Sequence, residues 1–204
     1  MQIDPSTLSR ANAYHFLISA IVPRPIAFVS TADARGHTNA APFSYFTGVS
    51  SSPPSLLICS GRRRDGIKDT QRNIVATREF VVNVVVEEMM NAVAIAGVDH
   101  PPGTSEFEMT GLTPAPSVKV AAPRIAESPV NLECRLLEIH EVAGTAIIVG
   151  EVVWIHLRDD LVATSPDGAE GTSGHVIDIG RLRPIARLGG DGYTRLGEVF
   201  EKKG

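Results

Sequence analysis

Apolar residues along the chain fall into six runs with the short, alternating spacing of β-strands. β-Branched residues dominate the most apolar run, Glu79–Val86 (EFVVNVVV), as is typical of a buried central strand. The predicted strands are Ile26–Thr31, Asn39–Pro42, Ser55–Ser60, Glu79–Val86, Pro129–Glu141 and Thr145–His156.

Three shorter segments carry apolar residues at helical spacing and predict helices: Ser9–Ile18, Lys68–Thr77 and Glu87–Ala96. Turn sequences at Ala34–Gly36 and Val142–Gly144 connect strands as hairpins, and no alternation of strand and helix is visible. The pattern therefore predicts a mainly β fold with short helices, an antiparallel barrel with helices packed outside. No repeat or clean linker interrupts it, so a single domain over residues 1–204 is expected.

Two segments do not fit regular elements. The stretch Asp99–Pro123 contains five prolines and reads as a long excursion from the barrel, and Thr164–Gly174 reads as a polar, glycine-rich loop. Neither segment predicts a function by itself.

Composition narrows the class of protein. The chain is 43% hydrophobic and 21% charged, and its formal net charge is −4. No basic stripe is present, which argues against nucleic-acid binding. The apolar runs are too short to span a membrane, and the N-terminus lacks a signal-peptide pattern, so a cytoplasmic protein is predicted. The two cysteines, Cys59 and Cys134, are expected to be buried and reduced.

The start of the second predicted helix has the chemistry of a phosphate site. Free backbone N–H groups and the positive end of the helix dipole meet there, and Lys68 and Thr70 add an ammonium and a hydroxyl. Asn73 lies on the same helical face as Thr70, and Ser60 and Arg62 lie just upstream. The alternative is an ordinary helix start, with Asp69 or Thr70 as the capping residue.

The segment from Asn39 to Pro54 (NAAPFSYFTGVSSSPP) combines small residues, hydroxyls and prolines with aromatic side chains. Small residues would let backbone amides approach the edge of a flat heteroaromatic ring, and prolines would limit the entropy lost on binding. A barrel corner, where small residues let a sheet bend, explains the same pattern. The segment alone does not decide between these two interpretations.

Taken in order, several of these stretches resemble the flavin reductase family, in its flavoredoxin-like branch. The resemblance rests on Arg24–Thr31, Asn39–Ser44, Ser52–Pro54, Lys68–Asn73 and Glu79–Asn83, and on the later stretches Gly111–Thr113, Glu127–Cys134, Val149–Val152 and Arg187–Tyr193. It covers nearly the whole chain. It implies a split β-barrel that binds FMN near the interface of a homodimer.

The resemblance also assigns roles to residues. It implies that the segment from Asn39 to Ser52, with Ala41, Pro42, Phe43 and Ser44, lies along the isoalloxazine ring. It puts the FMN phosphate near Ser60, Arg62, Lys68, Thr70 and Asn73, as the helix start indicates independently. Arg187–Tyr193 is expected close to the flavin, and Arg24 or Arg187 is a candidate cation beside the reduced ring. Apolar runs such as Phe80–Val86 are candidates for the dimer interface.

The chemistry of such a protein resides in its cofactor, so no side chain is named as catalytic. The histidines lack metal-ligand spacing, and no serine-hydrolase elbow, Walker loop or dinucleotide-binding glycine motif is present. The main hypothesis is a flavin reductase that takes hydride from NADH or NADPH and passes electrons on, possible acceptors including a partner protein. The alternative is an FMN-binding electron carrier without a nicotinamide site. A weaker third interpretation is an oxidase of pyridoxamine phosphate.

Overall fold

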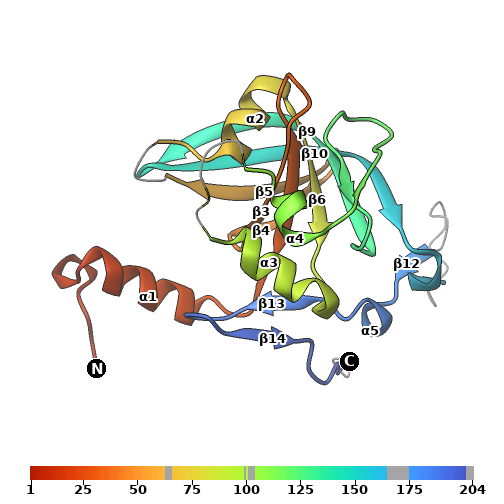
Figure 1. Cartoon of the computed structure of the whole chain (residues 1–204). Helices are drawn as coiled ribbons and strands as arrows, with labels where there is room; N and C mark the ends of the chain where they lie inside the picture. The colour runs from red at the N-terminus through yellow and green to blue at the C-terminus, as the bar shows by residue number, and fades with distance from the viewer. Residues whose placement is uncertain (63–65, 99, 101–103, 165–174, 201–204) are drawn as a thin grey trace.

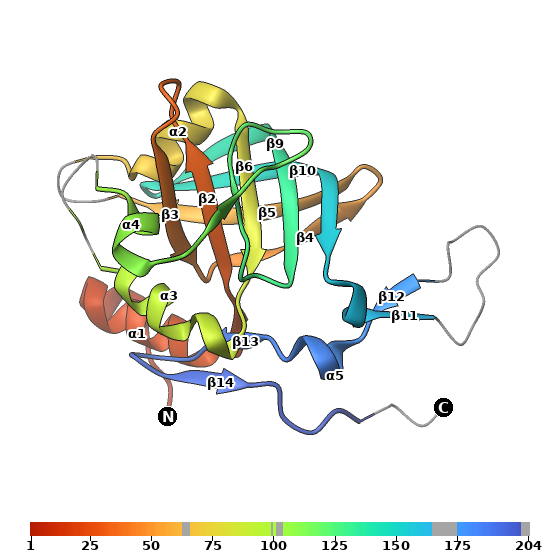
Figure 2. The same cartoon turned by 45° about the vertical axis from the view of Figure 1, so that its right-hand side comes forward.

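The computed structural model describes residues 1–62, 66–98, 100, 104–164 and 175–200. Its centre is a seven-stranded antiparallel sheet in the order β3-β2-β6-β9-β10-β5-β4, which curls round on itself (Figures 1 and 2). The strands are β2 (Ala27–Ala32), β3 (Thr38–Phe43), β4 (Phe46–Ser51), β5 (Pro54–Gly61), β6 (Glu79–Val84), β9 (Val130–Val142) and β10 (Thr145–Leu157). All six predicted strands are present, and the mainly β class is confirmed.

The β9–β10 hairpin turns at the predicted place. Val142 pairs with Thr145, and the residues between them, Ala143 and Gly144, both have positive φ (49° and 79°). A two-residue turn with this backbone matches the twist of the paired strands.

The segment after β3 contains a strand that the sequence pattern did not predict. Phe46–Ser51 forms β4, which pairs with β5 at the edge of the sheet. Most of its side chains are exposed, so the alternation that identifies a half-buried strand is missing. Small and hydroxyl residues at this exposed edge resemble loop residues in sequence.

The helices are short. They are α1 (Arg10–Ala20), α2 (Asp69–Thr77), α3 (Met90–Ala96), α4 (Glu106–Thr110) and α5 (Ile179–Leu182), with 3-10 turns η1 (Pro5–Thr7), η2 (Glu87–Met89) and η3 (Asp159–Leu161). The predicted helix over 87–96 is therefore η2 followed by α3. In Figure 1, α1 extends to the left, away from the barrel.

Two hydrophobic cores lie on opposite faces of the sheet. Ala27 and Val29 of β2 point into the barrel with Phe80 and with Ile74 of α2. Phe28 points the other way and packs in the second core, with Val93 of α3 and Phe107 of α4. This two-residue alternation explains why β2 is buried on both faces.

The central position of β6 corrects one expectation. Phe80, Val81 and Val82 are each 0% exposed, because β2 and β9 flank the strand. Phe80 and Val82 lie in the barrel core, and Val81 packs on the other face against Val120 and Ala122. Most of the run Phe80–Val86 is therefore part of the interior, and only Val84 is half-buried, so the run offers little surface to a second subunit.

The predicted excursion contains short elements where it is described. They are α4 and the paired strands β7 (Pro114–Ala115) and β8 (Arg124–Ile125). The predicted loop over 164–174 lies outside the described residues except for Thr164, which ends β11 (Val162–Thr164), the partner of β12 (His175–Ile177). The chain then forms β13 (Ile185–Arg187), which pairs with β1 (Arg24–Pro25) and β14 (Tyr193–Arg195).

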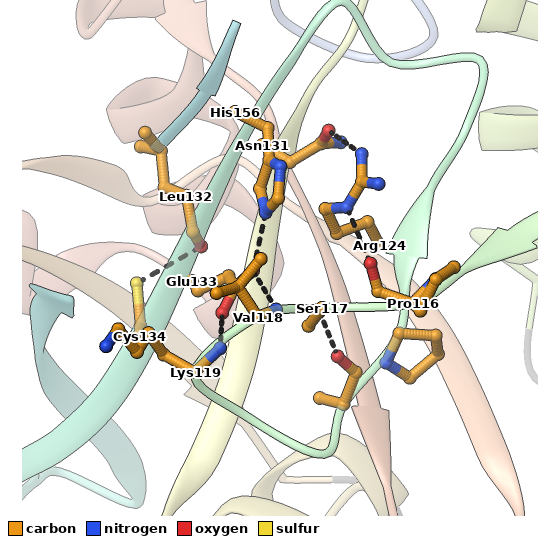
Figure 3. Close-up of polar contacts among 12 residues, drawn as sticks. Pro116, Ser117, Val118, Lys119, Arg124, Asn131, Leu132, Glu133, Cys134 and His156 are labelled. Carbon is orange, nitrogen blue, oxygen red and sulfur yellow. Dashed lines mark hydrogen bonds and ion pairs between the residues drawn. The ribbon is translucent and has the colours of Figure 1, made fainter. Parts of the chain in front are cut away.

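A buried carboxylate ties part of the excursion to the barrel (Figure 3). Glu133 of β9 accepts hydrogen bonds from the N–H groups of Val118 (2.7 Å) and Lys119 (2.6 Å), and His156 Nε2 lies 2.5 Å away. Burial would raise the pKa of Glu133, but the histidine contact and the two N–H groups hold that pKa below its usual value. The ionised carboxylate therefore holds the excursion against β9.

Both cysteines are free, as predicted. Cys134 is buried and burial raises the pKa of its thiol, whereas Cys59 is partly exposed. Among the described residues, no helix is long and apolar enough to cross a membrane.

Candidate active site

A groove of about 600 Å³ opens beside the end of β3, where α1, α3 and the C-terminal strands meet. Its walls mix apolar side chains with hydroxyl and guanidinium groups. Five predicted site residues line it, namely Arg24, Pro42, Phe43, Ser44 and Arg187, together with Tyr14, Val98 and Tyr193.

A smaller hollow of about 40 Å³ adjoins this groove at the start of α2. Pro42, Gly97 and Val98 line both, so the groove and the hollow lie side by side, and together they are called the trough. The hollow brings together the predicted residues Asn39, Ala41, Lys68 and Thr70, with Glu106 beside them. A side chain at Gly97 would lie 3.6 Å from the Pro42 ring and would narrow the junction.

The start of α2 borders this hollow through Lys68, Asp69 and Thr70. The N-cap residue is Lys68, not Asp69 or Thr70, and no side chain caps the helix. The first-turn amides of α2 therefore lack intrahelical partners. The Lys68 ammonium lies 5.3 Å from the centre of the Phe43 ring, where the groove and the hollow meet. The helix dipole and this ammonium together favour an anion there.

Thr70 and Asn73 are held by neighbours in β2 and β3. Thr70 Oγ1 lies 2.9 Å from the side-chain amide of Asn39, and Asn73 Nδ2 donates to Thr31 Oγ1 at 2.9 Å. Asn73 lines a separate depression on the other side of Asn39. The structure thus brings Thr70 to the hollow and does not bring Asn73 there.

Ser60 and Arg62 also lie away from the trough. Ser60 shares the barrel-facing side of β5 with Ile58 and is 0% exposed. Arg62 Nη2 lies 3.8 Å from Glu141 Oε2 on the β9 strand. Sequence proximity suggested that these residues close the phosphate site, but neither is among the residues that line the groove or the hollow.

Arg24 is a buried side chain at the wall of the groove, and it forms hydrogen bonds with several segments of the chain. Its guanidinium donates to the carbonyls of Ile18 (2.5 Å), Ile21 (3.0 Å) and Leu188 (2.8 Å), and Nε lies 3.4 Å from Ser44 Oγ. It thereby joins the end of α1 to the segment after β13. Its charge faces the groove, but its donors are occupied by the chain itself.

Arg187 lies next to Arg24 in the β1–β13 pair. Its guanidinium is 4.5 Å from the centre of the Tyr193 ring, donates to the Tyr193 hydroxyl, and donates to the Gly190 carbonyl at 2.8 Å. Its side chain is 29% exposed. Of the two predicted cations, Arg187 is therefore the more accessible from the groove.

The edge of β3 offers fewer backbone donors than the sequence suggested. The N–H of Ala40 points outward, since it donates to Glu106 Oε2 at 3.2 Å. Because directions alternate along a strand, the N–H groups of Ala41 and Phe43 face β2, and Pro42 has none. Ser44, beyond the strand end, is the next residue that can present its N–H to the groove.

Glu106 is a site residue that the sequence did not reveal. It is 6% exposed, and burial raises the pKa of its carboxyl group. It lies in the proline-rich excursion, 66 residues from Ala40, to which it bonds. No spacing rule connects these positions, because α4 must first fold back onto β3.

The matching family model describes a flavin reductase-like domain and covers residues 19–167. This chain belongs to the flavin reductase-like family. It is 41% identical to protein BH2278 of Halalkalibacterium halodurans, over 98% of this chain and 94% of that one. It is 31% identical to the NADH-dependent FAD reductase of Streptomyces globisporus, over 63% of this chain and 65% of that one.

Solved structures of the family are similar over their full length. Nitrilotriacetate monooxygenase component B from Bacillus cereus has a TM-score of 0.89 and 32% identity, over 99% of this chain and 98% of that one. Pseudomonas fluorescens 2-nitrobenzoate 2-nitroreductase NbaA has a TM-score of 0.86 and 28% identity, over 100% of this chain and 95% of that one. The split-barrel architecture expected from the resemblance is confirmed. An oxidoreductase of the flavin reductase class is the activity that the family indicates.

Proposed function

We propose that this protein is an FMN-binding oxidoreductase that takes hydride from NADH or NADPH and passes the electrons to an acceptor. The observation that carries the proposal is the trough: a groove of about 600 Å³ leads into a small hollow at the cationic start of α2. A flat ring with a short phosphorylated chain has this shape, and the volume falls within the ~300–1,000 Å³ of small-molecule sites.

The donor set in the trough fits FMN. Lys68 and the α2 amides would hold the phosphate, since an ammonium and a helix N-terminus both favour an anion. Pro42, Phe43 and Ser44 would flank the ring, and Arg187 would place a positive charge beside it. Bound flavin supplies the hydride-accepting chemistry, and these residues bind and orient it.

FMN is favoured over FAD because the hollow is small and bordered by Ala96 of α3 and Glu106 of α4, which leaves little room for an adenosine half beyond the phosphate. The Streptomyces relative, named as an FAD reductase, is the reason to test this directly. Denaturing the purified, flavin-loaded protein and separating the released flavin by chromatography is the measurement. FAD as the tightly held species would contradict the proposal.

Nicotinamide needs no dedicated motif if it stacks on an open face of the ring. The groove is lined on one side by Tyr14 and Val98, which are exposed, so a weak site with poor discrimination between NADH and NADPH is expected. Anaerobic addition of either dinucleotide should bleach the flavin absorbance within seconds. If dithionite bleaches it and neither dinucleotide does, the protein is an FMN-binding electron carrier that a partner protein reduces.

The remaining features of the proposal are a single domain and a homodimer in the cytoplasm. Exposed apolar side chains on α1 support the dimer: Tyr14, Phe16, Leu17 and Ile21 are each more than half exposed on a helix that extends from the barrel (Figure 1). Such a group of apolar side chains is typical of an interface.

A further inference from the structure

We propose that Glu106, Asn39 and Thr70 form a proton relay that turns the Thr70 hydroxyl toward the bound phosphate and takes up a proton as it does so. The inference rests on the proposed function, since it concerns the FMN phosphate. All three residues line the hollow at the start of α2 and are more than nine-tenths buried.

Asn39 connects the other two residues, and its amide group can face them in two ways. With its nitrogen toward Glu106, it donates to both carboxylate oxygens (3.1 and 3.3 Å), and its oxygen accepts from the Thr70 hydroxyl at 2.9 Å. The reverse orientation lets Asn39 donate to Thr70 Oγ1, also at 2.9 Å, but it places the amide oxygen against Glu106 and the amide nitrogen 3.3 Å from the Ala40 N–H. The first orientation is therefore the one that satisfies both ends of the amide while Glu106 is ionised.

Each orientation requires a different protonation state. The first needs an ionised Glu106, which accepts two hydrogen bonds. The second puts the Asn39 oxygen against the carboxyl group, which is favourable only if Glu106 is protonated and donates. Protonation of Glu106 therefore reverses the direction of every hydrogen bond in the relay.

The reversal changes what Thr70 offers to a ligand. When Glu106 is ionised, the Thr70 proton is used in the bond to Asn39, and only lone pairs remain for the hollow. When Glu106 is protonated, Thr70 accepts from Asn39 and its own proton is available to a phosphate oxygen. A phosphate in the hollow thus favours the protonated state, and the proton comes from solvent.

The electrostatic surroundings of Glu106 act in both directions, and their net effect is to raise its pKa. Burial and Asp69 raise the pKa of Glu106, while the Ala40 N–H and His100 oppose the rise. Lys68 of α2 lines the same hollow, α3 contributes the uncharged Ala96 and Gly97, and the exposed Glu108 shares α4. A phosphate dianion adds two negative charges beside Glu106, which raises its pKa further.

The test is FMN affinity between pH 7 and 9, with riboflavin as the phosphate-free probe. In this range a phosphate monoester is already a dianion, since its second pKa is about 6. Proton uptake makes affinity fall as pH rises, and we expect the FMN dissociation constant of the wild-type protein to increase about three- to thirty-fold from pH 7 to pH 9. Riboflavin affinity should not change.

Glu106→Gln imitates the protonated state, because its amide donates to the Asn39 oxygen at any pH. We expect this variant to bind FMN with a pH-independent affinity that exceeds that of the wild type at pH 9. Glu108→Gln, on the same helix but exposed, should retain the wild-type dependence. If the FMN affinity of Glu106→Gln depended on pH as strongly as that of the wild type, the relay would be overturned.

Thr70→Val separates a relay from simple charge repulsion. In a Thr70→Val background, Glu106→Gln should give no gain in FMN affinity at pH 9, because the hydroxyl that it orients is absent. An undiminished gain would show that Glu106 acts only through its charge and would overturn the relay.

Calorimetry of the wild-type protein needs no variant. Titrations at pH 8 in two buffers of different ionisation enthalpy should show proton uptake with FMN and none with riboflavin. No uptake, together with a clear preference for FMN over riboflavin, overturns the relay and leaves the proposed phosphate site intact. FMN binding no tighter than riboflavin at any pH overturns both.

Discussion

At the scale of single residues, polar side chains that line the site form hydrogen bonds with other parts of the chain. Arg24 donates to three backbone carbonyls. Its guanidinium shapes the wall of the trough and has few donors left for a ligand. Recognition of an anion is therefore expected at the start of α2, where the positive end of the helix dipole and the Lys68 ammonium border the hollow.

Lys68→Ala should weaken FMN binding about ten- to a hundred-fold, because a hydrogen bond to a charged group contributes roughly 1.5–3 kcal/mol and each ~1.4 kcal/mol is a factor of ten. Riboflavin affinity should be nearly unchanged, since it has no phosphate. Fluorescence titration of the flavin-free protein measures both.

The matched control is Lys119→Ala, which removes another lysine that lies over an aromatic ring, 5.4 Å from the centre of the Trp154 ring and on a different part of the barrel. It should leave both affinities unchanged. Equal losses for FMN and riboflavin in Lys68→Ala would point to a general defect of the fold instead of a phosphate contact.

At the scale of elements, close packing around the strands determines at which glycines a larger residue would destabilise the barrel. Gly150 lies in β10 where the pairing with β9 shifts register, and a Cβ there would lie 2.8 Å from Phe80 Cε1 and closer still to Cζ. Phe80 is fully buried in the barrel core and cannot move aside without disturbing its neighbours.

Gly150→Ala should therefore lower the free energy of unfolding by about 1–3 kcal/mol, the usual cost of overpacking a core. The measurement is urea unfolding of the flavin-free protein.

Gly48→Ala is the matched control, in edge strand β4, where a Cβ would meet nothing within 4 Å. It should change stability by less than about 0.5 kcal/mol. Similar losses in both variants would mean that backbone preference, not contact with Phe80, decides the effect.

At the scale of the whole molecule, a helix with exposed apolar side chains extends from the barrel. Apart from Ile18, the α1 residues are largely exposed, whereas Tyr14 and Ile18 also line the groove. A second subunit packed on α1 would thus cover apolar surface and lie close to the flavin site at once. Two-fold symmetric dimers are the commonest closed assemblies of soluble proteins.

Light scattering should give twice the mass of the chain for the wild-type protein at micromolar concentration. Leu17→Glu puts a charge among the exposed apolar side chains of α1 and should raise the dimer dissociation constant at least about ten-fold, since an unpaired charge at a buried contact is costly. Val142→Glu, at a comparably exposed valine on the β9–β10 turn, should leave the mass unchanged. A wild-type monomer would contradict the dimer.

The sequence by itself determined the strands whose neighbours bury them. Period-two alternation and β-branched residues identified all strands of the main sheet except β4. A strand with one or both faces buried needs apolar residues at the positions that face the core, and the sequence shows them. It also located the start of α2 and its lysine, since the chemistry of a helix start is local.

Only the tertiary structure decided which of the polar residues meet. Ser60 and Arg62 are close to Lys68 in sequence, but Ser60 on β5 is buried in the barrel, and Arg62, just after β5, lies beside Glu141. Glu106 is distant in sequence and becomes the neighbour of Asn39 and Thr70 once α4 packs on β3. Long-range contacts of this kind depend on how the sheet curls and which helices cover it, and no local pattern of residues encodes them.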